Sequence, residues 1–82
     1  MVMTRYETIQ QLGEEFITLI SKGFIPIHLL DWKVYYEAYL KETDLRKQRQ
    51  AKVRKTHVAC AIADEYNISE RTMFTVIAFM QS

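Results

Sequence analysis

The chain has 82 residues, of which 2 are glycine and 1 is proline. An average chain of this length carries about six glycines and about four prolines. Because tight turns depend on these residues, the composition excludes a β-sandwich or barrel and a glycine-rich phosphate-binding loop. A content of 49% hydrophobic and 26% charged residues argues against disorder, and the formal net charge is +1. We therefore expect a single all-α domain, residues 1–82, with four helices or five.

Several functional classes are disfavoured by the same composition. No apolar run approaches the roughly 20 residues that span a bilayer, and the N-terminus lacks the layout of a secretory signal, so we expect a soluble cytoplasmic protein without membrane contact. The single cysteine, Cys60, cannot form an internal disulfide, and with two histidines it shows no metal-ligand spacing. The acidic pairs 14–15 and 64–65 are adjacent in sequence, so their side chains point in different directions on a helix. Such pairs are unsuited to shared acid–base catalysis. The chain is therefore not expected to be an enzyme, nor to hold a metal, cofactor or small-molecule ligand.

The first helix is predicted to run from Thr4 to Lys22. Residues 4–7 have the form of a capping box, with Thr4 and Glu7 in the two capping positions. Gly13 lies inside this helix and is expected to weaken it or to mark the close approach of another helix. Gly23 follows as a C-cap with positive φ. The apolar face consists of Ile9, Leu12, Phe16, Leu19 and Ile20.

The second helix is expected to begin between Pro26 and Asp31, with a body of roughly residues 31–42. Residues 24–26 form the connector before it, whose apolar side chains should tuck under the helices. The second helix is rich in aromatic residues that we expect in the core or against a second subunit: Trp32, Tyr35, Tyr36 and Tyr39.

The segment 44–66 contains no breaker, and Thr43-Asp44 offers an N-cap before it. It is either one helix of about 34 Å or two helices separated near Thr56, which is itself a possible N-cap. The amphipathic part after this point carries Val58, Ala59, Ile62, Ala63 and Tyr66. The last helix is predicted to begin after Ser69 as N-cap and to run almost to Ser82.

Charge is unevenly distributed along the chain. Residues 1–45 carry four Lys or Arg against seven Asp or Glu, a balance of −3, while residues 46–82 carry seven against three, a balance of +4. Six of those seven cations fall in a ten-residue window without an acid, which we call the basic segment: Arg46, Lys47, Arg49, Lys52, Arg54 and Lys55. Such a run is typical of contact with nucleic acid.

The residues that follow the basic segment resemble a bacterial helix-turn-helix DNA-binding motif. Ala63 is the small residue expected where two helices cross, and Asn67 occupies the left-handed position that usually holds glycine. Ile68 is the apolar plug of the turn, Ser69 caps the second helix, and Met73 with Val76 or Ile77 faces the core. The resemblance covers about residues 56–80 and is to sigma-factor-like, Trp-repressor-like and mobile-element regulator domains. No family is recognised in residues 1–43.

The resemblance implies a double-stranded DNA partner, with the last helix in the major groove and the preceding basic helix on the phosphate backbone. Base-reading candidates are Ser69, Glu70, Arg71, Thr72, Phe74 and Thr75. Phosphate-contacting candidates are the six cations of the basic segment and His57. Neutralising six phosphates would give a log–log salt slope of about −5. Residues 1–43 would serve as a scaffold or build a homodimer.

Other interpretations stay open from the sequence. The last helix is strongly apolar, so a second subunit or the aromatic helix of the same chain is expected to cover part of it. The chain could instead be a helical adaptor that docks a partner protein through this helix, with the basic segment only aiding solubility. Binding of RNA through the basic segment is a third interpretation.

Overall fold

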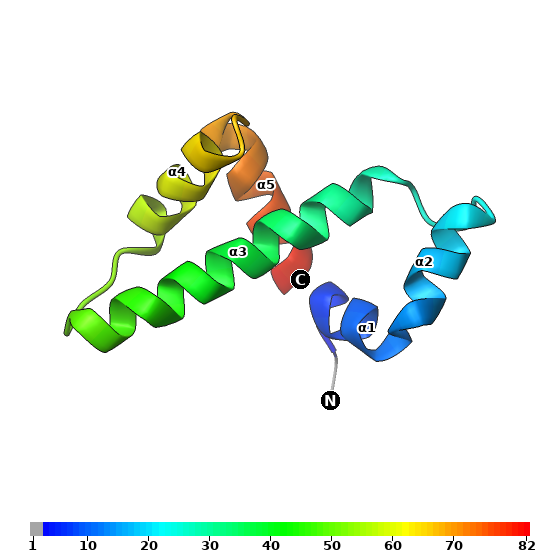
Figure 1. Ribbon diagram of the computed structural model, residues 1–82, viewed down its shortest axis with the longest axis horizontal. Helices are drawn as coiled ribbons and strands as arrows, with labels where there is room; N and C mark the ends of the chain where they lie inside the picture. Colours follow the sequence, from blue (N-terminus) through cyan, green and yellow to red (C-terminus); the bar gives the residue numbers. More distant parts are fainter. Residues whose placement is uncertain (1–2) are drawn as a thin grey trace.

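The computed structural model describes residues 3–82, and these residues form five α-helices and no strand. In chain order the helices are α1 (Arg5–Leu12), α2 (Glu14–Ser21), α3 (His28–Arg49), α4 (Lys55–Glu65) and α5 (Glu70–Gln81). Figure 1 shows the long α3 running diagonally through the molecule, with α4 on one side, α5 crossing α3 so that the C-terminus lies near α1, and α2 at the periphery. The predicted all-α class is confirmed, and the number of helices is five.

The single first helix predicted from Thr4 to Lys22 is wrong, because the chain breaks at Gly13. The capping box at its start is present, with the Glu7 backbone N–H donating to Thr4 Oγ1 at 3.1 Å. Gly13 has φ 54° and ψ −126°, a backbone conformation that residues other than glycine rarely adopt. A Cβ atom added there would meet nothing within 4 Å, so no neighbouring helix explains the glycine. The backbone reversal itself requires it.

Gly23 ends α2 as predicted, with φ 81°. The backbone N–H groups of Gly23 and Phe24 donate to the carbonyl oxygens of Ile20 and Leu19 at 3.0 and 2.9 Å, the bonding pattern of a glycine C-cap. The connector that follows differs from the prediction. Phe24 is 75% exposed and only Ile25 is half-buried, so its apolar side chains are not all tucked under the helices.

The third helix, α3, begins within the predicted interval between Pro26 and Asp31 and extends further than predicted at its C-terminal end. It begins at His28 after Ile27, and neither Pro26 nor Asp31 starts it. The N-cap predicted at Thr43-Asp44 is wrong: Thr43 is buried within α3 and its Oγ1 donates to the Tyr39 carbonyl oxygen at 2.8 Å. An ion pair between Glu42 and Arg46, with N···O 3.0 Å, spans the expected boundary and supports helix on both sides of it.

The segment 44–66 is divided between two helices, α3 and α4, and is not one continuous helix. Helix α3 ends at Arg49, and α4 begins at Lys55 with Arg54 as its N-cap, so Thr56 lies inside the first turn and is not the cap. The Arg54 carbonyl oxygen accepts from the N–H groups of His57 and Val58. Within the intervening loop, Val53 is half-buried against the core. The reversal lets the apolar stripe of α4 fold back onto α3, which a continuous rod would leave in water.

The core is formed by α3, α4 and α5, with α1 and α2 closing one end. From α3 the aromatic rings of Tyr36 and Tyr39 enter it, and Tyr6 of α1 meets Tyr36 edge-on with ring centroids 4.8 Å apart. The other members are Ile9, Phe16, Val58, Ala59, Ile62, Ala63, Met73, Val76 and Met80. Trp32 and Tyr35 are half-buried beside these residues, so the core assignment of the aromatic helix is confirmed.

The C-terminal end of α5 packs against the aromatic helix of the same chain. This was one of the two expectations for it, the other being a second subunit. The Trp32 ring contacts the Phe79 ring edge-on, with centroids 5.4 Å apart. The Arg5 guanidinium lies 4.5 Å from the centroid of the Phe79 ring. Across residues 3–82, no helix combines the length and the apolar character that crossing a membrane would require.

Candidate nucleic-acid interface

Helices α4 and α5 are joined by a short turn whose conformation depends on Asn67. Asn67 has φ 56° and is the only residue other than glycine with positive φ in the described part of the chain. The N–H of Asn67 donates to the Asp64 carbonyl oxygen at 3.3 Å and that of Ile68 to the Ala63 carbonyl oxygen at 2.9 Å. These two bonds end α4 and turn the chain sharply. The left-handed conformation predicted for Asn67 is confirmed.

Ser69 begins α5 as predicted. Its Oγ accepts from the Thr72 backbone N–H at 3.0 Å, and the two side-chain oxygens of Ser69 and Thr72 are hydrogen-bonded at 2.8 Å. The hydroxyl groups of two base-reading candidates are therefore part of the N-cap. A third, Thr75, donates its Oγ1–H to the Arg71 carbonyl oxygen at 2.9 Å. The hydroxyls of Ser69 and Thr72 thus stabilise the start of α5, and that of Thr75 bonds to the helix backbone one turn earlier.

The packing of α4 on α5 follows the predicted pattern of small and apolar positions. Ala63 and Ile62 are buried on the α4 side, and Met73 and Val76 are fully buried on the α5 side. Tyr66 departs from its predicted role in closing α4 onto the core. It is 37% exposed, and its ring lies against Tyr35 at 5.2 Å between centroids.

One face of α5 is exposed along its first two turns. The base-reading candidates on it are Glu70, Arg71, Phe74 and Thr75, with Ser69 exposed just before the helix and Thr72 half-buried beside it. Ala78 lies on the same exposed face and was missed, although its spacing from Arg71 and Thr75 is helical. The opposite face carries Met73, Val76 and Met80. The helix thus divides into a core-facing stripe and a solvent-facing stripe that begins at its N-terminus.

The exposed stripe has both polar and apolar character. The Arg71 guanidinium and the Glu70 carboxylate form no ion pair within residues 3–82. Phe74, 42% exposed, is the one large apolar side chain in the stripe. A free guanidinium can bind two acceptors side by side, and an exposed ring can contact a methyl group.

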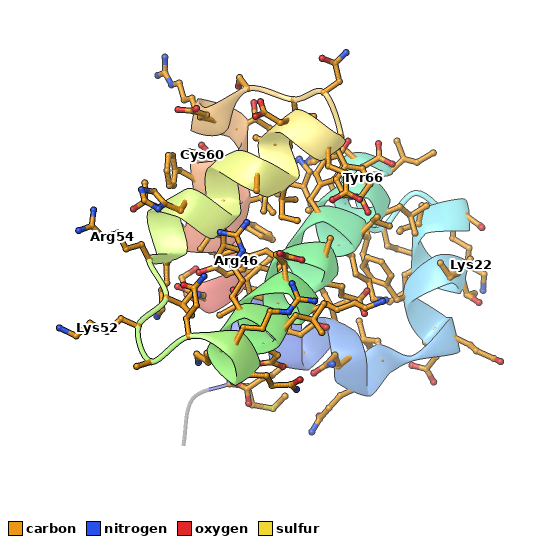
Figure 2. All side chains as sticks on the ribbon, turned by 60° about the vertical axis from the view of Figure 1, so that its left-hand side comes forward. Lys22, Arg46, Lys52, Arg54, Cys60 and Tyr66 are labelled. Atoms are coloured by element: carbon orange, nitrogen blue, oxygen red, sulfur yellow. The ribbon has the colours of Figure 1, made fainter. Side chains whose placement is uncertain are left out.

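The basic segment is not the continuous helix that was predicted. Arg46, Lys47 and Arg49 lie in the last turn of α3, where cations favour the helix dipole. Lys52 and Arg54 lie in the loop, and Lys55 and His57 begin α4. All are exposed except Arg46, which is half-buried and paired with Glu42. In Figure 2, Lys52 and Arg54 extend away from the body of the protein, on the side opposite to Lys22.

The start of α4 is a concentration of positive charge. It has no acid in its first turn, and the Arg54 side chain makes no capping bond. In the described chain the N–H groups of Lys55 and Thr56 have no hydrogen-bond partner. Free N–H groups and the helix dipole add to the cationic side chains, and a phosphate placed there would satisfy all three.

Cys60 lies in the middle of α4, between the basic start of this helix and the turn that leads to α5. Burial raises the pKa of the Cys60 thiol, and the Glu70 carboxylate at the start of α5 adds to the effect. Lys55 precedes Cys60 by five residues, a rise of about 7.5 Å along the helix. Cys60 is half-buried. Among the described residues, no three His, Cys, Asp or Glu side chains are placed to hold a metal ion.

No protein-family model, curated protein or solved structure significantly matches this chain.

Proposed function

We propose that this protein binds double-stranded DNA, with the N-terminal half of α5 in the major groove and the basic segment on the phosphate backbone. It would act as a small transcriptional regulator or as an accessory protein of a mobile element. The observation that carries the proposal is the exposed stripe of α5, in which Arg71 and Phe74 project from a helix whose other face is locked into the core. An exposed face at the start of a helix is what a recognition helix needs in order to reach base edges in the major groove, and this supports the proposal.

The side chains of the stripe suit the chemistry of base edges. Arg71 can donate two hydrogen bonds to O6 and N7 of guanine, and Glu70 can accept one from N4 of cytosine. The Phe74 ring can contact a thymine methyl group. Ser69 and Thr75 are exposed residues, and each hydroxyl oxygen has a second lone pair that can accept a further bond. The rigid turn at Asn67 would hold these groups in one orientation.

The basic start of α4 is close enough to the stripe for both to engage one duplex. The major groove is about 12 Å wide, and phosphates line both of its edges. The axial rise of about 7.5 Å from Lys55 to Cys60, which lies beside Glu70, is shorter than this width. A helix in the groove and cations on its edge are therefore compatible with a single binding pose.

The uneven charge of the chain would orient the protein on DNA. Residues 1–45 have a balance of −3, and α2, which begins with Glu14 and Glu15, lies at the opposite end of the molecule from the loop between α3 and α4 (Figure 1). Phosphates would attract the basic end and repel the acidic end, which raises the rate of productive encounters.

We further propose that two copies bind together on a pseudo-palindromic site with half-sites about 34 Å apart. Ile17, Phe24 and Ile27 are large apolar side chains exposed on α2 and the connector, away from the basic segment. Sedimentation velocity of the protein with and without a duplex carrying both half-sites tests this. A single copy on every duplex would contradict it.

Fluorescence anisotropy with a random-sequence duplex at two salt concentrations tests the DNA proposal. Binding is expected at low salt and should weaken steeply as salt rises, because cations of the protein displace condensed counterions. Absence of binding at low salt, or binding that is indifferent to salt, would contradict it. Competition with duplex RNA separates DNA from RNA, since the narrow major groove of RNA cannot admit α5.

The adaptor interpretation, in which α5 docks a partner protein, has less support. The large apolar side chains Met73, Val76 and Met80 of α5 are fully buried in the core of the same chain. They offer no surface to a partner unless the domain opens.

A further inference from the structure

A second surface lies between α3 and α4, away from the exposed stripe of α5. It is a groove of about 540 Å³, formed along one side of α3 and closed by the C-terminal half of α4. We call it the α3–α4 groove. Ala38 and Ile62 form part of its lining, and Tyr66 stands at the end of α4 (Figure 2). None of the base-reading candidates lines it, and the one link to the basic segment within residues 3–82 is the ion pair of Arg46 with Glu42 of the lining.

The α3–α4 groove gathers large apolar side chains that are left in water. Val34 is 49% exposed, Leu45 is 38% exposed, and Tyr66 is 37% exposed. Val34 and Leu45 lie eleven residues apart on α3, which is about 16 Å or three helical turns. Exposed apolar side chains that share one groove can form an interaction site. Its length fits three turns of a helix, which would place apolar anchors at successive turns.

Carboxylates line the groove beside these apolar side chains. Glu37, Glu42 and Glu65 belong to its lining, against Lys41 as the single cation. The ion-pair partners of Glu37 and Glu42 are Lys33 and Arg46, which lie outside the lining. Glu65 forms no ion pair in the described chain. Within residues 3–82, Glu65 is therefore the carboxylate whose charge is left unpaired at the border of the groove, while Glu37 and Glu42 each keep their second oxygen, Oε2, outside the ion pair.

We infer that the α3–α4 groove binds an amphipathic helix of a partner protein, with apolar residues on one face and Lys or Arg along the edges of that face. Apolar anchors would cover Val34, Leu45 and Tyr66, and the cations would meet the three carboxylates. Such charge complementarity sets the orientation of the partner and excludes acidic helices. The inference does not rest on DNA binding, because the two surfaces share no residue.

A second copy of this chain is a poorer occupant than such a partner. The cations of the chain are concentrated in residues 46–55, where Val53 is the one large apolar residue and is already half-buried. The helices that carry apolar stripes bury them in their own core. Helix α3 does expose Val34 and Leu45 at helical spacing, but the carboxylates beside them would face the same carboxylates of a second copy.

Selection of peptides on the full-length protein tests the inference. The probe is a displayed library of about 14-residue peptides on an alanine-rich helical framework, which is about 21 Å long when helical. Selected peptides should carry apolar residues at helical spacing and a net positive charge. The consensus peptide is then synthesised together with a version in which each Lys or Arg is replaced by Glu. The cationic peptide should bind at least about tenfold more tightly by anisotropy.

Variants of the protein locate the contact. Val34→Asn with Leu45→Gln changes two exposed side chains and should abolish binding of the cationic peptide while circular dichroism stays that of the wild type. Glu65→Lys should weaken binding about tenfold, and the matched control Glu14→Lys, a charge reversal on exposed α2, should not. Recovery of no peptide, equal binding of the two synthetic peptides, or equal effects of the two reversals would overturn the inference. The inference would also be overturned if the wild-type protein were a dimer and the Val34 and Leu45 changes made it a monomer. A second copy of the chain would then be the occupant of the groove.

Discussion

Ile68 donates its backbone N–H to the carbonyl oxygen of Ala63 at 2.9 Å, across the turn that separates α4 from α5. The bond forms because Asn67, between them, adopts φ 56°. Asparagine tolerates this left-handed conformation better than any residue except glycine. One residue thus sets the direction in which α5 and its exposed stripe leave α4.

Replacing Asn67 should change stability according to the backbone freedom of the new residue. Asn67→Gly should leave the free energy of unfolding within about 1 kcal/mol of the wild type, because glycine adopts positive φ without strain. Asn67→Val should lower it by about 1–2 kcal/mol, since its side chain clashes with the backbone in this region. Urea denaturation followed by circular dichroism measures both. Equal stability of the two variants would show that the turn does not depend on this conformation.

Removing charge from the loop should weaken DNA binding without affecting sequence preference. Lys52→Gln with Arg54→Gln removes two exposed cations, and the slope of log K against log salt should fall in magnitude by about 1.8, because each phosphate contact contributes about 0.9. Lys22→Gln is the matched control, since Lys22 lies on the opposite side in Figure 2. Salt titrations on a random duplex give the slopes. A similar decrease in the control would mean that only total charge matters.

Arg71 should determine sequence preference at one position of the site. Arg71→Ala is expected to reduce discrimination at a guanine by about 1–3 kcal/mol, the typical value for a bidentate contact. Arg71→Lys keeps the charge and loses the planar pair of donors, so it should retain affinity for random DNA but relax the same preference. Selection of preferred duplexes from a random pool, with each variant, measures this. An unchanged preference in both variants would remove Arg71 from the base-reading set.

Alkaline conditions should destabilise the core through Tyr39. Burial raises the pKa of Tyr39 above its ordinary value of 10.0, and Tyr36 adds to the shift. The unfolded chain therefore ionises first, so the contribution of Tyr39 to stability is complete below about pH 10 and is lost as pH rises toward the raised pKa. Burial, followed by Glu37, acts in the same direction on Tyr6.

Urea titrations at a series of alkaline pH values measure this loss. Tyr39→Phe should flatten the fall in unfolding free energy above about pH 10, because its side chain cannot ionise. Tyr66→Phe, at an exposed tyrosine, serves as the control and should leave the fall unchanged. If the two variants behave alike, ionisation of Tyr39 does not limit alkaline stability.

Local signals in the sequence were sufficient at several positions where a single residue decides a conformation, although the break at Gly13 was missed. The capping box at Thr4, the positive φ of Gly23 and Asn67, and the N-cap at Ser69 were all predictable, because each depends on groups within a few residues. The same logic failed at Thr43, whose hydroxyl can cap a helix or bond to the carbonyl four residues earlier. Its burial within α3 selected the second alternative.

The sequence by itself determined the helical class, the turn between α4 and α5 and the division of α5 into two faces, because composition, left-handed positions and helical spacing are local properties. Only the tertiary structure decided where α3 ends, since the chain turns back at 50–54 to bury the stripe of α4 against residues distant in sequence. It also decided that the basic segment is spread over two helix ends and a loop, and that Val34, Leu45 and Tyr66 share the α3–α4 groove. Such juxtapositions arise from burial of apolar surface, which depends on all packed elements at once.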